Sequence, residues 1–297
     1  MMMNSLAGVL ARLFLFTFLV PGIVLAQEQD DGIGMEGHMR NGSLVFETAF
    51  VDGPRSGDPV IVGQPYSAVQ VSEHSETLAD GTKIHSKWES ARLYRDAQGR
   101  TRTERFTWAG ALPVHTVEPG RRIARISDPV AGYVHVLDLR RHIAHRLKIL
   151  TEAEFAERIR NEENVEATTE AQKAAPDPRL GASSPGPEVK QQKLAKNLFE
   201  GGELAVRQMT ITTPKGLEGN DRPLVLACEN QYSEELKSTI LSKCSDPRAG
   251  DNITRLEILE RTDPDPALFQ VPTDYIVVDE VDQFRIDLGI ADAPKQR

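Results

Sequence analysis

A regular succession of β-type segments and turn signals between Tyr66 and Leu150 constrains the fold of this chain most. Residues of high β propensity recur there, and turn sequences separate them at Asp80-Gly81, Asp96 to Gly99, Glu118-Pro119-Gly120, Asp128-Pro129 and Asp138 to Arg141. No helical periodicity lies between these turns. Such spacing is typical of an antiparallel meander. The sequence therefore predicts a mainly β protein.

The register of one hairpin follows from its turn. If Gly99 is left-handed after a type I turn at Ala97-Gln98, then Asp96 pairs with Arg100. A two-residue loop at Asp80-Gly81 adds a third strand and sets Thr77 opposite Ile84. Continuing these pairings places one set of apolar side chains on a single face: Trp88, Trp108, Phe106, Tyr94 and Val71. The opposite face is polar, so we expect a sheet with one buried face.

A helix is predicted from Thr151 to about Lys173, because Thr151 can cap it and Glu154 follows three residues later. A connector rich in Pro and Gly follows, from Ala174 to Glu188. Strands resume near Lys193. We expect the fold class to be a curved antiparallel sheet or half-barrel, with the helical insertion covering its concave face.

These elements suggest a division of the chain. Residues 66–280 would form a single β domain, interrupted by a helix and linker insertion at 151–190. Residues 27–65, which are rich in Gly, Asp and small polar residues, would form a loosely ordered N-terminal arm. Residues 281–297 would form a C-terminal tail.

The first 26 residues have the features of a secretory signal peptide. Arg12 precedes the apolar run from Leu13 to Val20, a Pro21-Gly22 break follows, and Ala26 supplies a small residue for cleavage. The run is shorter than the ~20 residues that a transmembrane helix needs. We therefore expect a periplasmic or secreted mature chain without a membrane span.

Cys228 and Cys244 are the two cysteines of the chain. In an oxidising compartment they can form one disulfide. Two separate buried thiols are the alternative, because a bridge depends on strand register.

Composition and motifs argue against several functions. The net charge of −9 argues against general nucleic-acid binding. The sequence has no Gly-x-Ser-x-Gly, His-Glu-x-x-His or Ser-x-x-Lys motif, so we expect neither an enzyme nor a cofactor. His135 and His145 would be cross-strand neighbours if Leu139-Arg140-Arg141 formed a three-residue loop. With no third ligand assigned, no metal site is predicted.

Several motifs between Pro214 and Tyr275 resemble those of a known family. They are Gly219-Asn220-Asp221-Arg222-Pro223, Tyr232-Ser233-Glu234-Glu235-Leu236, Ser245 to Gly250 and Pro264 to Tyr275. Together with the turns at Leu78 to Gly81 and Tyr94 to Arg100, they resemble an uncharacterised family of exported bacterial β proteins. The closing Leu268 to Tyr275 is similar to the last strand of periplasmic half-barrels of the lipoprotein-carrier (LolA-like) type. The resemblance implies an exported half-barrel and brings no catalytic or binding residues with it.

The leading hypothesis is an exported, non-enzymatic protein that binds a hydrophobic or lipid-like ligand in the sheet groove. Trp88, Trp108, Phe106, Tyr94 and Val71 would line that groove; the alternative is that they form plain core beneath the helix. The second hypothesis is a structural or assembly module of the cell envelope. It would bind a protein partner through a sheet edge or through the basic sector between Lys83 and Lys148.

Overall fold

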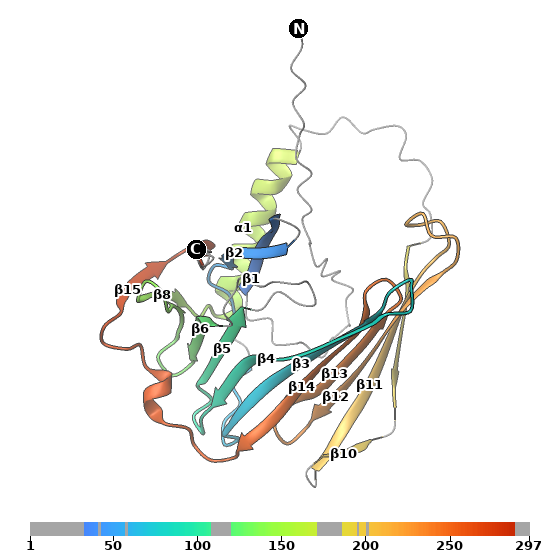
Figure 1. Cartoon of the computed structure of the whole chain (residues 1–297). Helices are drawn as coiled ribbons and strands as arrows, with labels where there is room; N and C mark the ends of the chain where they lie inside the picture. The colour runs from blue at the N-terminus through green and yellow to red at the C-terminus, as the bar shows by residue number, and fades with distance from the viewer. Residues whose placement is uncertain are drawn as a thin grey trace, which may run out of the picture.

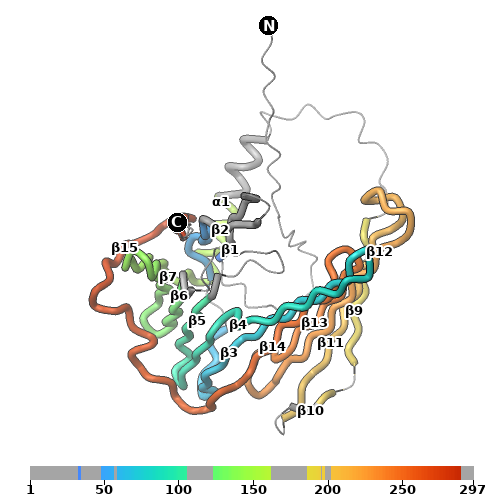
Figure 2. The backbone as a smooth tube through the Cα atoms, viewed as in Figure 1, coloured from blue at the N-terminus to red at the C-terminus, as the bar shows by residue number. Residues whose placement is uncertain are grey.

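The computed structural model describes residues 33–40, 43–56, 59–107, 120–170, 186–194, 196–199 and 202–288. These residues form a 13-stranded sheet, a three-stranded sheet, one α-helix and one 3-10 helix. The large sheet curves and does not close: β15 lies at one edge, and β9 and β10 lie at the other (Figures 1 and 2). The prediction of a mainly β, half-barrel architecture is confirmed.

The large sheet has the order β10-β11-β12-β13-β14-β3-β4-β5-β6-β7-β8-β15, with β9 also paired to β11. Its strands are β3 (Tyr66–Thr77), β4 (Lys83–Arg95), β5 (Thr101–Thr107), β6 (Gly120–Asp128), β7 (Tyr133–Asp138), β8 (Ile143–Lys148), β9 (Glu188–Lys193), β10 (Asn197–Phe199), β11 (Gly202–Thr213), β12 (Leu224–Ser233), β13 (Ser238–Asp246), β14 (Gly250–Glu260) and β15 (Ile276–Glu280). Neighbouring strands are antiparallel except that β15 runs parallel to β8. The sheet is therefore mixed, and its last strand departs from the predicted antiparallel pattern.

The β4–β5 hairpin has the predicted register. Gly99 has a φ of 84°, and its N–H donates to the Asp96 carbonyl at 3.1 Å. The Asp96 carboxylate also accepts the backbone N–H of Arg100 at 2.8 Å. Tyr94 pairs with Arg102, as expected. This turn is specified by residues within five positions of one another, which is why the sequence alone predicts it.

A β-bulge in β4 changes which of its side chains share a face. Val71 pairs with Glu89, but the preceding Gln70 pairs with Ala91, so Ser90 is an extra residue in β4. The alternation of side chains before Ser90 is therefore out of phase with the alternation after it.

The small sheet covers one face of the large sheet, which we call the inner face. Its strands, in the order β1-β2-β16, are β1 (Ile33–Arg40), β2 (Ser43–Val51) and β16 (Phe284–Asp287). Buried side chains from the small sheet and from β6 to β8 form one cluster: Ile33, Ala49, Val51, Ile123, Val136, Leu147, Ile286 and Leu288. The stretches expected to form an arm and a tail thus contain strands that pack over β6, β7 and β8 (Figure 1).

The opposite, outer face of β6 to β8 is covered as well. Here the 3-10 helix η1 (Pro266–Phe269) and the residues after it pack on the sheet. Buried Phe269 contacts Ala124, Ile126, Leu137 and Ala144, with Tyr94, Leu139, Leu268, Val271 and Tyr275 around them. The segment that resembles a last strand is therefore a helical turn followed by an irregular stretch. Pro266 suits the start of η1, and the Asp265 carboxylate accepts the Ala267 N–H at 2.9 Å.

A third cluster lies where β3 begins. It contains Tyr66, Ala68, Leu204, Leu236, Ile240 and Leu256. Arg95 is buried beside it: its Nε donates to the Gln64 carbonyl at 2.8 Å and its Nη2 to the Leu236 carbonyl at 2.6 Å. Burial lowers the pKa of Arg95, and its guanidinium lies 4.6 Å from the centre of the Tyr66 ring. Arg95 thereby ties the β12–β13 turn to β3 and β4.

The helix α1 (Glu152–Glu170) begins as predicted but does not cover the sheet as predicted. The Glu154 carboxylate accepts the Thr151 N–H at 2.9 Å, and the Thr151 Oγ1 accepts the Glu154 N–H at 3.3 Å. Phe155 is half-buried and Ile159 is exposed, while Arg158 donates to the Val281 carbonyl at 2.9 Å. The described start of α1 thus contacts the β15–β16 connection, and the inner-face cover comes from the small sheet. No helix within the described residues is long and apolar enough to span a membrane.

Candidate functional site

The candidate site is the inner face of the strands that lie away from the small sheet, from β9 to β14 and on to β3 and β4. We call this part of the sheet the flank. Cross-strand pairs place Val136, Arg125, Thr103, Leu93 and Ala68 on one face. Because Val136 belongs to the inner-face cluster, the even-numbered residues of β3 also point to the inner face.

The inner face of the flank carries a middle row of apolar and uncharged side chains. In register across six strands, this row consists of Met209, Cys228, Cys244, Asn252, His74 and Ser86. Ile211 and Leu226 lie next to it on β11 and β12 and pair with each other. Met209, Ile211 and Leu226 are each half-buried. These side chains therefore form an accessible apolar strip, in contrast with the fully buried clusters elsewhere.

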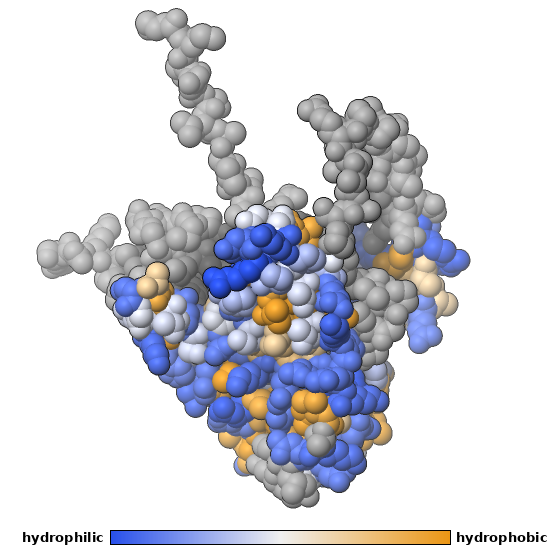
Figure 3. Space-filling view, turned by 90° about the vertical axis from the view of Figure 1, so that its right-hand side faces the viewer, coloured by the Kyte–Doolittle hydropathy of each residue, from blue (hydrophilic) through white to orange (hydrophobic). Residues whose placement is uncertain are grey.

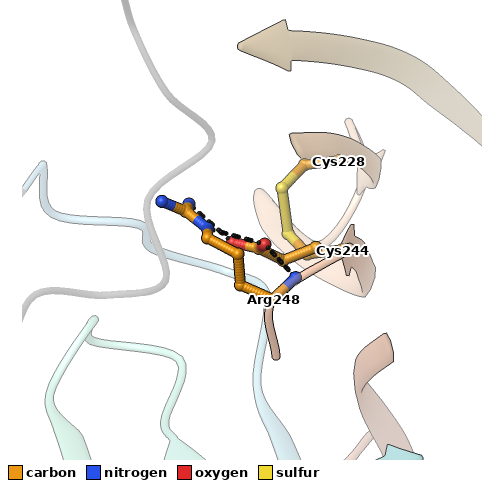
Figure 4. The surroundings of a disulfide bond; sticks show 4 residues. Cys228, Cys244 and Arg248 are labelled. Atoms are coloured by element: carbon orange, nitrogen blue, oxygen red, sulfur yellow. Dashed lines mark hydrogen bonds and ion pairs between the residues drawn. A yellow bond between two sulfur atoms is a disulfide. The ribbon is translucent and has the colours of Figure 1, made fainter. Parts of the chain in front are cut away.

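Cys228 and Cys244 form a disulfide within this row (Figure 4). They are directly opposite each other on β12 and β13, with Cα atoms 4.1 Å apart. The bridge fixes the relative register of two strands of the flank. Asp246 lies two residues further along β13, where hydrogen bonds from Arg248 lower its pKa.

Polar groups on the inner face bind mainly to one another. The Ser72 hydroxyl donates to Ser90 Oγ at 2.9 Å, and the Ser90 hydroxyl donates to the Gln70 carbonyl at 3.2 Å. His74 Nδ1 lies 2.9 Å from Asn252 Oδ1. These contacts hold the polar side chains in place between the apolar ones.

The outer face of the same strands is charged. Glu73 lies 3.3 Å from Lys87 Nζ and 3.4 Å from Arg255 Nη1. Burial alone would raise the pKa of Glu73, but the hydrogen bond from Lys87 and the charge of Arg255 lower it. On the side that carries the β9–β11 edge, the surface is mostly hydrophilic with separate hydrophobic residues (Figure 3). The outer face also carries apolar side chains, among them Val225 at 45% exposure, so what distinguishes it is its ion pairs.

The structure divides the predicted ligand residues between the two faces. Trp88 pairs with Ser72 and lies on the inner face, half-buried. Tyr94 pairs with Ser67 and packs near Phe269 on the outer face, where Val71 also points. The Ser90 bulge separates Trp88 from Tyr94, so the expected common face is not formed. Trp108 and the side chain of Phe106 lie outside the described residues.

The register on the Trp88 side of the bulge is also one residue away from the prediction. Thr77 pairs with Lys83, where the two-residue loop placed it opposite Ile84. The turn is longer than predicted: the Leu78 N–H donates to the Thr82 carbonyl at 2.8 Å. The bulge at Ser90 absorbs this difference, and the expected pairing of Val69 with Arg92 is restored beyond it.

The histidines of the β7–β8 hairpin do not meet. Its loop includes His142, which has a φ of 55°, so His145 pairs with Val136 and His135 pairs with Arg146. His135 and His145 therefore lie on opposite faces. Burial and the charge of Arg146 lower the pKa of His135. The part of the chain that the structure describes contains no group of three potential metal ligands.

A small pocket lies beside the small sheet, between Val51, Arg55, Arg125, Val136 and Leu147. Its cavity volume is about 20 Å³. That volume suits about one water molecule. A ligand of acyl-chain size therefore does not fit in this pocket.

Met209, Ile211 and Leu226 are site residues that the sequence reasoning did not find. Both faces of β11 carry apolar side chains, so alternation alone leaves the direction of Met209 open. The available signal was the pair of cysteines: a bridge between adjacent strands places Cys228 opposite Cys244 and thereby fixes the β12–β13 register.

No family model and no curated protein sequence matches the chain. Among solved structures it is similar to lipoprotein LppX of Mycobacterium tuberculosis, with 9% identity over 67% of this chain and 90% of that chain, and a TM-score of 0.23. A LolA superfamily protein from Nitrosomonas europaea has 10% identity over 73% and 94%, with a TM-score of 0.25. LprF from Mycobacterium bovis has 11% identity over 69% and 90%, with a TM-score of 0.23. LolA-type structures, which the closing segment resembles in sequence, are thus among the matches. All three TM-scores lie below 0.5.

Proposed function

We propose that this chain is an exported, non-enzymatic protein that binds a lipid or another hydrophobic ligand on the inner face of the flank. One observation carries the proposal. On the same strands, the outer face bears ion pairs and the inner face bears the half-buried apolar strip of Met209, Ile211 and Leu226. Contiguous accessible apolar surface is a common feature of ligand-binding sites on folded proteins.

Two features support export to the periplasm or the cell exterior. The N-terminal apolar run has the pattern of a signal peptide. The Cys228–Cys244 disulfide suits an oxidising compartment, since disulfides are rare in the reducing cytosol.

The inner-face hydroxyls support a binding role over a catalytic one. Ser72 donates to Ser90, and Ser90 donates to a backbone carbonyl. A nucleophilic serine instead needs a neighbouring base that accepts its proton. These hydrogen bonds fit a structural role for Ser72 and Ser90.

Adjacent residues of β11 provide a matched test. Ile211 points to the inner face and pairs with Leu226, while Thr210 points to the outer face and pairs with Ala227. We expect Ile211→Asp to weaken binding of a fluorescent monoacylglycerol by at least about tenfold, because a carboxylate would be buried against the acyl chain. Thr210→Asp should change the affinity less than about twofold.

Binding is measured by fluorescence titration at a fixed probe concentration, and the unfolding midpoint is measured for both variants. Equal affinities for the two variants, or no binding by the unaltered protein, would refute the proposed function. Mass spectrometry of lipids that co-purify from the native host gives a second reading, and the Ile211→Asp protein should carry less of them.

A second candidate function is an envelope assembly module that binds a protein strand at the β15 edge. Ile276, Val277 and Val278 on that edge are 69%, 45% and 39% exposed, whereas the β9 edge carries Lys190 and Lys193. Lysines discourage strand addition, and exposed β-branched residues favour it. Crosslinking from Val277 in the native host would favour this function if it captured one envelope protein stoichiometrically, with capture abolished by Val277→Lys.

A further inference from the structure

Two cations face each other on the inner face at the β9 end of the flank. Lys193 of β9 and Arg207 of β11 are directly paired in register. Arg207 is half-buried and Lys193 is exposed. Both point to the same face as the disulfide, because Arg207 pairs with Asn230, which is in turn paired with Ser242 on β13.

No carboxylate within the described ranges forms an ion pair with either of these cations, although other lysines of the flank have such partners. Lys190, which points to the outer face of β9, lies 3.1 Å from Glu188. Like charges placed directly opposite each other in a ladder destabilise it. The pair therefore has a cost in the ligand-free protein that an added anion would remove.

The row that contains these cations continues as a line of hydrogen-bonding side chains. In register from β12 to β4 it consists of Asn230, Ser242, Thr254, Ser72 and Trp88. The middle row, with Met209 and the disulfide, lies beside it, and Ile211 and Leu226 lie beyond. A polar, cationic margin thus borders an apolar strip on one continuous surface.

We propose that the ligand is an anionic lipid whose phosphate or carboxylate head lies between Lys193 and Arg207. Its acyl chain then follows β11 along Met209 and Ile211, a path of roughly 13 Å for the four residue-to-residue steps from Arg207 to Ile211 at ~3.3 Å each. This inference rests on the proposed function and adds the charge of the head group. Arg207 can form two parallel hydrogen bonds to such a head, while Lys193 acts as a point charge.

Three lipids with the same acyl chain test the head-group assignment: lysophosphatidic acid, lysophosphatidylcholine and monoacylglycerol. The unaltered protein should bind the anionic lipid at least about tenfold more tightly than the other two. The preference should fall as salt is raised, because exposed charges are screened. In the double variant Lys193→Gln/Arg207→Gln the three affinities should become equal, with monoacylglycerol binding unchanged.

Control variants separate this effect from general charge and from misfolding. Lys243 lies on the outer face of β13, so Lys243→Gln should keep the preference for the anionic lipid. Arg207→Lys should keep part of it. If the double variant folds poorly, the exposed single change Lys193→Gln replaces it. Removing one of the two opposed cations should also raise the unfolding midpoint of the ligand-free protein slightly, because the repulsion between them is lost. If Arg207 had only a structural role, its replacement would not raise the midpoint.

The outcomes distinguish the two proposals. Equal binding of all three lipids by the unaltered protein overturns the head-group assignment and leaves lipid binding standing. Binding of none of them overturns the proposed function together with this inference. If inorganic phosphate binds the Lys193–Arg207 pair and displaces no lipid, the pair is a free phosphate site, and the lipid assignment is refuted.

Discussion

The strands β6 to β8 and the flank belong to one curved sheet but are treated differently by the rest of the chain. Strands β6 to β8 are covered on the inner face by the small sheet and on the outer face by η1, so Ile123, Ile126 and Leu137 are almost fully buried. Away from the buried cluster at the start of β3, the flank has half-buried apolar side chains such as Met209 and Ile211 on its inner face and ion pairs on its outer face. The comparison teaches that one part of the sheet supplies stability and the other part an accessible surface.

The largest expected effect comes from replacing an isoleucine with alanine, once in β6 and once in the flank. Ile123→Ala in β6 should lower the free energy of unfolding by about 2–5 kcal/mol, because it leaves a cavity under the small sheet. Ile211→Ala in β11 should cost less than about 1 kcal/mol, because Ile211 is half-buried. Urea unfolding measures both. Equal costs would mean that the flank face is as well covered as β6.

The next effect concerns the disulfide of the flank. Cys228 and Cys244 are 16 residues apart, and closing a loop of that length stabilises by ~3 kcal/mol in the chain-entropy model. Replacing both cysteines with Ala should lower the stability by up to about that amount. Amide hydrogen exchange should accelerate in β12 and β13 while β6 to β8 keep their protection. Uniform acceleration across the whole sheet would contradict the division.

A smaller effect separates Trp88 from Tyr94. Trp88→Ala should weaken monoacylglycerol binding by only about twofold, since Trp88 shares the inner face with the apolar strip but lies on β4, four strands from Leu226. Tyr94→Ala should instead lower the thermal midpoint without changing the affinity, because Tyr94 packs near Phe269 on the outer face. The same titration and a melting curve check both. Loss of binding by Tyr94→Ala would place the ligand elsewhere.

The smallest effect is on pH dependence. The pKa of His135 is lowered in the folded protein, so the unfolded chain takes up a proton first as the pH falls. The stability contribution is fully present above the ordinary value of about 6.5 and is lost as the pH falls through the folded pKa. This loss of stability should affect β7 and not the flank. In the His135→Gln variant, the urea unfolding midpoint should fall less between pH 7 and pH 5 than it does in the unaltered protein. An unchanged dependence of the midpoint on pH would refute the assignment of this effect to His135.

Local turn chemistry was predictable, and register across the whole sheet was not. The Asp96–Gly99 turn was predicted correctly because its hydrogen bonds join near neighbours. The β7–β8 turn differed because His142 adopts a positive φ that only a minority of non-glycine residues take. One residue of difference there moves His135 and His145 to opposite faces. The same happened to Trp88 and Tyr94 through the Ser90 bulge.

By itself the sequence determined the β class of this chain, its main turns and the capped start of α1, because each depends on residues that are close in the chain. The tertiary structure decided which faces are covered, and by what: the small sheet joins β1 and β2 to β16, more than 200 positions later. It also placed Lys193, Arg207 and Met209 on the face of Trp88. Those placements depend on every ladder between β9 and β4, and one bulge anywhere in that series reverses the result.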